Sequence, residues 1–203
     1  MQLPPVDHNY AAAFAGLHLS LFERSFNLPG QAAITLTEQH RMHPSISAWP
    51  SQYFYQGLLI NAAAVREYDS VASSPWIGDA RIAFVHVEGP EQTVGKGYSS
   101  ADEADMAAKI VQGMLCAGSV GAENIGVITP YDAQRAMIKT RMTSGVEVAS
   151  VDSFQGREKE VMVLSLVRFN GRRAIGFCSN RKRPKWHSLV PSGGLSYLAL
   201  FTR

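Results

Sequence analysis

Two patterns in this sequence could handle a nucleotide phosphate, and the first is a glycine followed by a lysine. Gly95-Lys96 is the only such pair in the chain. A phosphate-binding P-loop needs four residues between its glycines, and a Ser or Thr after the lysine to hold magnesium. Here five residues separate Gly89 from Gly95, and Gly97 follows Lys96. The sequence therefore predicts no P-loop, and no ATP hydrolysis by this chain alone.

The second pattern is the acidic tetrad Asp102-Glu103-Ala104-Asp105. Carboxylates that hold magnesium beside a nucleotide follow a buried apolar strand. A short stretch containing Gly97, Ser99 and Ser100 precedes this tetrad instead. Ser100 and Glu103 have the spacing of a capping box, and acidic side chains suit the positive end of a helix dipole. We therefore expect a helix to begin here rather than a metal site.

His40 and His43 form a third candidate, because two imidazoles three residues apart can share a metal ion. The sequence shows no evident carboxylate or cysteine partner for them. His43 also precedes Pro44, and a residue before proline favours an extended main chain. We expect no metal site in this chain.

The elements that must position any site can be read from the apolar periodicity. One helical face of apolar residues runs from 101 to 116, and a second helix is expected over 132–142. A helix opening at Pro44 should bend or break at Pro50, whereas 61–79 and 89–97 have loop composition. Short buried strands separated by helices predict an α/β fold with a mostly parallel sheet and helices on both faces. The predicted strands are 34–36, 81–87, 125–128, 146–151 and 161–167.

Composition favours one domain: 203 residues with 46% hydrophobic content can bury one α/β core. Cys116 and Cys178 stand far apart and no apolar signal segment begins the chain, so we expect a reducing compartment, cytoplasmic or nuclear. No apolar run approaches the roughly 20 residues needed to cross a bilayer, so no membrane partner is expected.

Charge is distributed unevenly along the chain. Eight of the 19 basic residues and none of the 17 acidic residues follow Glu160. Such a basic end attracts phosphate polyanions, and a solvated tail explains it equally well. Periodicity fades after Asn170, and residues 192–194 look like a linker.

Three segments, in order, carry a family resemblance. They are residues 36–47 (Leu-Thr-Glu-Gln-His-Arg-Met-His-Pro-Ser-Ile-Ser), 128–134 (Ile-Thr-Pro-Tyr-Asp-Ala-Gln) and 151–160 (Val-Asp-Ser-Phe-Gln-Gly-Arg-Glu-Lys-Glu). With the opening Gln-Leu-Pro-Pro of residues 2–5, they resemble the second RecA-like half of superfamily 1 RNA/DNA helicases of the nonsense-mediated-decay and senataxin type. The resemblance covers the chain from Gln2 to about Gly176, and it implies a RecA-like P-loop NTPase second domain, incomplete at both ends.

The resemblance implies a composite site, in which ATP lies between two RecA-like halves. The other half supplies the P-loop and the carboxylate for Mg²⁺, and this half supplies cations and polar groups to the γ-phosphate. Arg41 is then the arginine finger, since a fixed guanidinium neutralises charge on the transferred phosphoryl group. Without the flanking motif, Arg41 would be read as a surface salt-bridge residue. Gln2 would position the attacking water or sense the γ-phosphate, and His40 stands where many relatives stack a tyrosine on adenine.

The third segment implies further contacts to the nucleotide. Glu158 would accept hydrogen bonds from the ribose hydroxyls, and Gly156 would let the main chain approach without a Cβ clash. Arg157 would pair within the site or with phosphate. The alternative for residues 156–158 is an ordinary turn into the strand at Val161. Thr129 and Ser153 would bond the phosphates of single-stranded RNA or DNA without reading bases, as a motor moving 5′ to 3′ requires.

The resemblance ends after residues 175–183. Relatives continue into a helix with a second γ-phosphate arginine, whereas this chain continues with 184–191 (Pro-Lys-Trp-His-Ser-Leu-Val-Pro). The second arginine and the final strand of the sheet are therefore expected to be absent. We divide the chain into an inter-domain motif and linking helix (1–26), the RecA-like domain (27–176) and a divergent basic tail (177–203). Two alternatives to half of a helicase stay open: an inactive module that binds nucleic acid or a partner, and an unstable truncated product.

Overall fold

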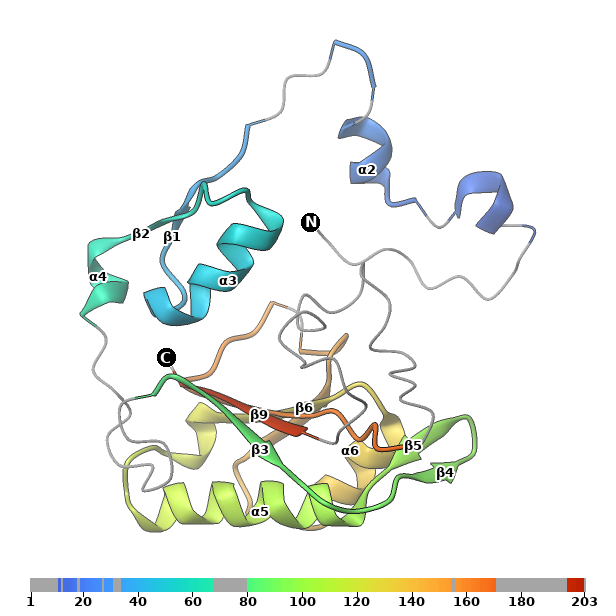
Figure 1. Cartoon of the computed structure of the whole chain (residues 1–203), viewed down its shortest axis with the longest axis vertical. Coiled ribbons are helices and arrows are strands. Elements are labelled where there is room, and N and C mark those ends of the chain that lie inside the picture. Colours follow the sequence, from blue (N-terminus) through green and yellow to red (C-terminus); the bar gives the residue numbers. More distant parts are fainter. Residues whose placement is uncertain are drawn as a thin grey trace.

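The computed structural model contains a five-stranded sheet in the order β3-β9-β8-β6-β7. Figure 1 labels β3, β9 and β6 of this sheet. β6 pairs in parallel with β7 and β8, while β9 pairs antiparallel with β8 and β3. Four of the five strands therefore run in one direction, so the predicted α/β class with a mostly parallel sheet is confirmed. The strands are β3 (Ile82–His86), β6 (Ile125–Thr129), β7 (Glu147–Ser150), β8 (Val161–Ser165) and β9 (Tyr197–Thr202).

Several predictions fall on residues that the structure does not describe. These are the predictions for Gln2, for the basic end after Asn170 and for the missing second arginine. Arg168 is the one member of the basic end that is described. The structure describes residues 11, 13–17, 19–26, 28–30, 34–67, 80–154, 156–170 and 197–202, with only the main chain for the last segment.

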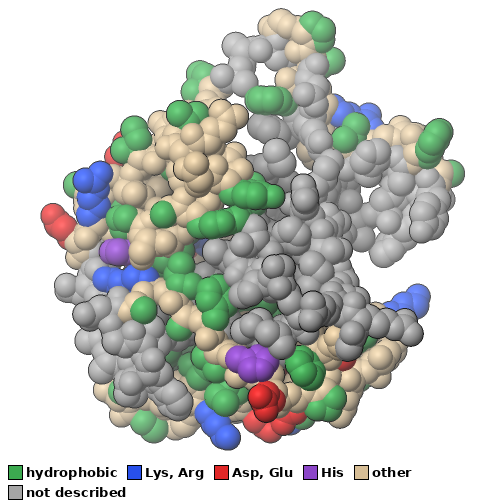
Figure 2. Space-filling model, in the orientation of Figure 1, with side chains coloured by type: hydrophobic (Ala, Val, Ile, Leu, Met, Phe, Trp, Pro, Cys, Tyr) green, Lys and Arg blue, Asp and Glu red, His purple; other side chains and the backbone are tan. Residues whose placement is uncertain are grey.

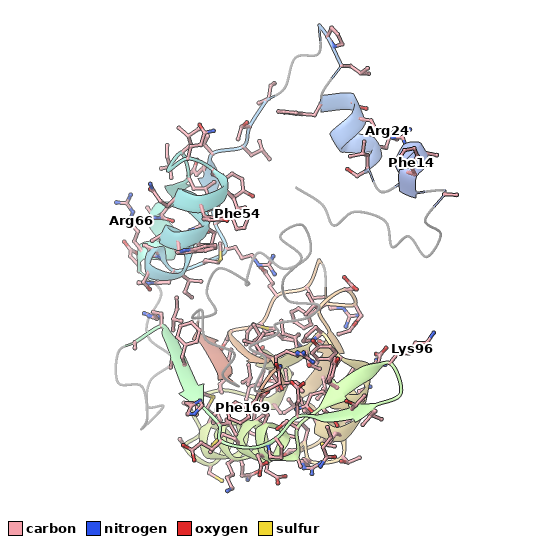
Figure 3. All side chains as sticks on the ribbon, turned by 45° about the vertical axis from the view of Figure 1, so that its right-hand side comes forward. Phe14, Arg24, Phe54, Arg66, Lys96 and Phe169 are labelled. Carbon is pink, nitrogen blue, oxygen red and sulfur yellow. The ribbon has the colours of Figure 1, made fainter. Side chains whose placement is uncertain are left out.

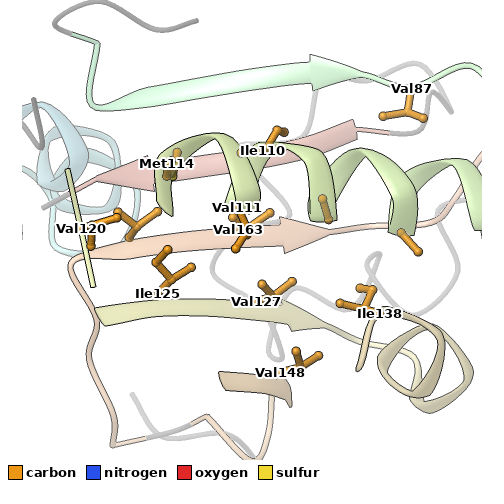
Figure 4. Packing of buried hydrophobic residues seen from close by; sticks show 13 residues of the cluster. Val87, Ile110, Val111, Met114, Val120, Ile125, Val127, Ile138, Val148 and Val163 are labelled. Atoms are coloured by element: carbon orange, nitrogen blue, oxygen red, sulfur yellow. The ribbon is translucent and has the colours of Figure 1, made fainter. Parts of the chain in front are cut away.

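Two helices, α5 (Ala101–Cys116) and α6 (Asp132–Lys139), pack on one face of the sheet. Successive side chains of a strand point to opposite faces, so alternate apolar residues of β6 and β8 meet these helices. Burying each such side chain contributes about 1.5–3 kcal/mol, which explains why the apolar runs become central strands. The larger hydrophobic cluster (Figure 4) includes Ile110, Val111, Met114, Ile125, Val127, Ile138, Val148, Val161 and Val163.

The opposite face of the sheet carries the other alternating set, including Ile128 and Leu164. Phe154 packs on them from the turn after β7, and Ile46 packs from α3 (Pro44–Phe54). Figure 1 shows α3 on the side of the sheet away from α5. Helices therefore approach both faces, as the sequence predicted. This second face also brings the segments around residues 41 and 156 together.

A small unit around α3 holds the first of these segments. β1 (Glu38–Gln39) and β2 (Ile60–Asn61) form a separate parallel pair, with α4 (Ala63–Arg66) directly after β2. The Ile60 N–H donates to the Thr37 carbonyl at 2.7 Å, which aligns the two strands. Pro50 lies inside α3, and the helix continues beyond it to Phe54. Of the bend or break expected at Pro50, the break does not occur, and the helix tolerates the proline.

Two predictions about strands are wrong. Ile34 and Leu36 are 91% and 84% exposed, and the strand begins only at Glu38. Its partner β2 is only two residues long, so among the described residues the main chain at 34–36 has no strand to pair with. The final strand, expected to be absent, is present as β9 between β3 and β8, in the register Ile82↔Phe201 and Val161↔Thr202. β9 gives the main-chain N–H and C=O groups of both neighbouring strands hydrogen-bond partners. Buried peptide groups require such partners.

The segment predicted as a loop over 89–97 contains part of a hairpin. β4 (Gln92–Val94) pairs antiparallel with β5 (Gly97–Ser99), and Gly95 in the turn has a φ of +59°. Glycine adopts this left-handed conformation at little cost, which permits the tight reversal. Lys96 lies in this turn and its side chain points away from the sheet (Figure 3).

Three short helical segments complete the described elements: η1 (Ala13–Leu17), α2 (Leu21–Phe26) and η2 (Ala122–Asn124). Around the first two, large apolar side chains are exposed, including Phe14 at 97% and Leu21 at 81%. Hydrophobic side chains are visible around these two helical segments in the space-filling view (Figure 2). Within the described ranges, no helix has the length and apolar character needed to cross a membrane.

Candidate functional site

Arg41 contacts the turn that follows β7, although the two are far apart in sequence. Its guanidinium Nη2 donates to the main-chain carbonyl of Arg157, 116 residues further along the chain. Its Nε lies 3.7 Å from a carboxylate oxygen of Glu158. The structure thus brings together one cation and one carboxylate that the sequence assigned to the same nucleotide site.

The Arg41–Glu158 pair is open to solvent. The two side chains are 56% and 57% exposed. Ion pairs this exposed contribute about 0–1 kcal/mol, because water screens the charges and both side chains lose conformational freedom. A phosphate, which can form charge-assisted hydrogen bonds to a guanidinium, could therefore compete for Arg41 at little cost.

The main chain at Arg41 is held by the side chain of Gln39, at the end of β1. The Gln39 Oε1 accepts hydrogen bonds from the N–H groups of Arg41 and Met42, at 3.0 and 2.8 Å. The Gln39 Nε2 donates to the Met42 carbonyl at 2.7 Å and to Asn61 Oδ1 at 2.6 Å. The turn that presents Arg41 is therefore tied to both strands of the small unit.

His43 follows this turn and caps α3. Its Nδ1 accepts from the Ser45 N–H at 3.3 Å and lies 2.8 Å from Ser45 Oγ. Burial lowers the pKa of His43, and the positive charge of Arg81 lowers it further. The neutral imidazole that results can act as the acceptor that a helix N-terminus requires.

The turn after β7 is built from Ser150, Ser153 and Phe154. The two serine hydroxyl oxygens lie 2.8 Å apart, and the Phe154 N–H donates to the Ser150 carbonyl at 3.0 Å. Phe154 is buried against the second face of the sheet, which anchors the turn. Gly156 follows with a φ of +83°, and a Cβ placed on it would meet no atom of the other described residues within 4 Å. The glycine thus has an unusual conformation and faces open space.

Arg157 contributes its carbonyl to Arg41, but its side chain turns to β7. The Arg157 guanidinium forms an ion pair with Glu147, and Lys159 Nζ lies 3.2 Å from the other Glu147 oxygen. Partial burial raises the pKa of Glu147, but the hydrogen bonds and charges of Lys159 and Arg157 outweigh it and leave the pKa below its ordinary value of 4.5. The described partner of the Arg157 side chain is therefore this strand carboxylate.

His40 is exposed next to the Arg41 turn. Its Nε2 lies 3.5 Å from a carboxylate oxygen of Glu38, and its side chain is 69% exposed. A largely exposed ring leaves area on which a flat base could stack.

The two residues assigned to nucleic acid differ sharply in exposure. Ser153 is exposed at the surface of the turn. Thr129 is fully buried, and its hydroxyl oxygen accepts from the Tyr131 N–H at 3.5 Å. This burial argues against a direct contact between the Thr129 hydroxyl and a strand, and the hydroxyl serves the turn into α6.

The acidic tetrad starts α5, as expected, but only half of the capping box forms. Ser100 Oγ accepts from the Glu103 N–H at 3.3 Å. The Glu103 carboxylate does not return to Ser100 and instead accepts from the Val167 N–H at 3.0 and 3.1 Å and from Ser165 Oγ at 2.5 Å. The Ser100 N–H donates to Gln134 Oε1 at 2.8 Å. Glu103 thus holds the end of β8, where Val167 has a φ of +69°.

A comparison of the whole sequence with known protein families places the chain. A family profile described as an AAA domain matches residues 17–184. The chain belongs to this AAA-domain family. The predicted resemblance to the C-terminal RecA-like domain of superfamily 1 helicases is thereby supported by a match that contains all three motif segments.

Individual relatives of this AAA domain agree with that assignment. The regulator of nonsense transcripts 1 homolog of Drosophila melanogaster is 40% identical over 195 residues, covering 90% of this chain and 16% of the relative. The homolog from Arabidopsis thaliana is 41% identical over 196 residues, with 90% and 16% covered. The ATP-dependent helicase NAM7 of Saccharomyces cerevisiae is 42% identical over 197 residues, with 90% and 20% covered. The chain thus spans a fifth or less of the length of these relatives. The matches confirm the family resemblance.

Three polar residues of the AAA domain that tie separate segments together received no role from the sequence. Gln39 and Asn61 fix the Arg41 turn. Gln134, fully buried, bonds Ser100 through both ends of its amide and also donates to Ser165 Oγ at 3.0 Å. Gln39 and Gln134 lie inside the motif segments. Their polar amides, each close to a short predicted strand, were the sequence feature that could have indicated a positioning role. Nothing in the sequence around Asn61 indicates that it meets Gln39.

Proposed function

We propose that this AAA domain supplies one wall of a composite ATP site in an RNA or DNA helicase, with the P-loop wall contributed by another RecA-like half. The contact of Arg41 with Arg157 and Glu158 is the observation that carries the proposal. It places an exposed guanidinium next to a carboxylate and an open glycine, which is a set of groups suited to phosphate, ribose and a closely approaching nucleotide.

The described groups fit ATP in three respects. Arg41 is solvent-exposed and weakly paired, so it can turn to a γ-phosphate. Glu158, also exposed, can accept from ribose hydroxyls. The space around Gly156 is open to at least 4 Å from a Cβ position. We assign these three residues the roles of arginine finger, ribose acceptor and close-approach point.

Magnesium is assigned to the other half. Within the described part of the chain, no three His, Cys, Asp or Glu side chains gather as a metal site. Bound Mg²⁺ would draw charge from the phosphate oxygens of ATP. The residues of this chain would hold and orient the nucleotide from the opposite side, with Arg41 stabilising charge on the transferred group. His40 would contribute stacking on the base.

Nucleic acid would contact the same turn from outside. Ser153 is exposed only three residues before Gly156, so a strand bonded at Ser153 and a nucleotide at Gly156 would share one short segment. Such a turn can couple the two ligands, because movement of either displaces the other. Single-stranded RNA is the substrate that we propose, since the relatives are named regulators of nonsense transcripts.

The test is a chimera in which the RecA-like domain of this chain (27–176) replaces the matching segment of the yeast ATP-dependent helicase NAM7, which keeps its own continuation. RNA-stimulated ATP hydrolysis is expected from the chimera, and none from the isolated chain. Arg41→Ala in the chimera should reduce kcat by about 10³-fold or more, as loss of an arginine finger does. Arg66→Ala, at an exposed arginine on α4, is the matched control and should leave turnover unchanged. Full turnover by Arg41→Ala would contradict the proposal.

A further inference from the structure

We propose that Gln39 is a positioning residue that sets where the Arg41 guanidinium points, through hydrogen bonds of its side-chain amide to the main chain of the Arg41–Met42 turn. This inference rests on the proposed function, because it concerns the residue assigned as the arginine finger. Gln39 itself touches no nucleotide in this scheme and acts through Arg41.

The Gln39 amide uses all of its hydrogen-bonding capacity. An amide has two donor hydrogens and an oxygen with two lone pairs. Oε1 accepts from the N–H groups of Arg41 and Met42 at 3.0 and 2.8 Å. Nε2 donates to the Met42 carbonyl at 2.7 Å and to Asn61 Oδ1 at 2.6 Å. Turning the amide over would face nitrogen to two donors and oxygen to two acceptors, so one orientation is strongly favoured.

The other end of this arrangement is anchored in the interior of the small unit. Asn61 Oδ1, on β2, also accepts from Ser47 Oγ at 2.7 Å. Ser47 lies on the first turn of α3 and is 1% exposed. A continuous set of hydrogen bonds therefore runs from a buried residue of α3, through Asn61 and Gln39, to the main chain of Arg41.

This main-chain anchor acts on Arg41 separately from its side-chain contacts to Arg157 and Glu158. The ion pair with Glu158 is over half exposed and separated by 3.7 Å, so it restrains the guanidinium weakly. A nucleotide entering the site would also compete for that pair. The Gln39 bonds act on the backbone instead, and they are independent of whether Glu158 is engaged. An error of about 1 Å in a catalytic group can cost about 100-fold in rate.

The sharpest variants separate the donors from the acceptors of this amide. Gln39→Ala removes all four hydrogen bonds. Gln39→Glu keeps the size and the two accepting bonds to Arg41 and Met42, but it loses both donors and sets oxygen against the Met42 carbonyl and Asn61 Oδ1. Gln52→Ala, at an exposed glutamine of α3, is the matched control. Thermal unfolding of each variant checks that the fold is kept.

The first measurement uses the isolated chain and ¹⁵N relaxation of the Arg41 and Met42 amides. Order at both amides should drop in Gln39→Ala, drop less in Gln39→Glu and stay unchanged in Gln52→Ala. Unchanged order at both amides in Gln39→Ala would overturn the inference, whatever the catalytic result, because it would show that the amide does not hold the turn.

The second measurement is ATP turnover of the yeast chimera with Gln39→Ala, Arg41→Ala and the double variant. We expect Gln39→Ala to lower kcat about 10- to 100-fold with little change in KM for ATP, and to cause no further loss when Arg41 is already alanine. If Gln39→Ala lowered kcat as much in the Arg41→Ala background as in the parent chimera, Gln39 would have a general structural role. That result would overturn the inference. Unchanged turnover in Arg41→Ala would overturn the proposed function instead, so the two failures are distinguishable.

Discussion

Arg168, just after β8, forms an ion pair with Glu91 in the segment before β4, with Nη1 and Oε1 3.2 Å apart. The side chains are 7% and 14% exposed, and the Arg168 guanidinium carbon lies 3.8 Å from the centre of the Tyr98 ring. Glu91 Oε2 also accepts from the Phe169 N–H at 3.0 Å. This arginine, counted from the sequence with the basic end that attracts nucleic acid, instead fastens the β4–β5 hairpin to the end of β8.

Removal of Glu91 should destabilise the fold strongly. Glu91→Ala leaves the Arg168 charge buried without that carboxylate, and breaking a buried pair in this way costs about 3–5 kcal/mol. The free energy of unfolding in urea measures the change. Asp132→Asn, in the exposed pair with Arg135, is the control and should cost about 0–1 kcal/mol. Similar losses in both variants would mean that the Glu91 pair is no stronger than a surface pair.

Replacement of Gly156 by alanine should strain the turn after β7. The φ of +83° lies in the left-handed region, which costs residues with a Cβ about 1–2 kcal/mol. Space around Gly156 is open, so the conformation alone causes the loss. Urea unfolding of Gly156→Ala measures it. Gly97→Ala serves as the control, since its Cβ would meet Val94 O at an ordinary 3.7 Å. No difference between the two variants would argue against the strained turn.

Glu147 should make stability depend on acidity. Its folded-state pKa lies below the ordinary 4.5, since the bonds from Lys159 and Arg157 outweigh burial. The unfolded chain therefore takes up this proton at higher pH than the folded chain does. The stabilisation is complete above about pH 4.5 and is lost as pH falls through the lower folded-state pKa.

Urea unfolding at a series of pH values tests this dependence. Glu147→Gln cannot ionise, so stability in this variant should fall less steeply below about pH 4.5 than in the parent chain. Glu88→Gln, at an exposed glutamate, should keep the parent slope. An unchanged slope in Glu147→Gln would place the acid sensitivity elsewhere in the protein.

Single-stranded RNA binding should distinguish Ser153 from Thr129. Ser153→Ala removes an exposed hydroxyl, and loss of one hydrogen bond of about 0.5–1.5 kcal/mol corresponds to about two- to tenfold weaker binding. Thr129→Val keeps the shape of a buried side chain and should leave affinity unchanged. Fluorescence anisotropy of a labelled RNA oligonucleotide with each variant gives Kd. Weaker binding by Thr129→Val, with Ser153→Ala unaffected, would reverse the assignment.

The α/β class, most strands and the motif segments were predictable because their signals are local. Short, nearly continuous apolar runs in 125–128 and 161–167 predict buried strands whatever surrounds them. The spacing around Gly95 likewise excludes a P-loop without any structure. The three motif segments and their order along the chain identified candidate site residues, including Arg41 and Glu158.

Tertiary structure alone decided which of these residues meet, and which are hidden. Arg41 reaches Arg157 because α3 and the turn after β7 pack on the same face of the sheet, through Ile46 and Phe154. Thr129 and Arg168 are enclosed by packing between elements distant in sequence, so their residue types alone suggested exposed roles. Strand β9 pairs with β3 and β8, which both lie far from it in sequence. Burial and long-range hydrogen bonds depend on which segments pack together. The residue pattern of one segment therefore cannot predict them.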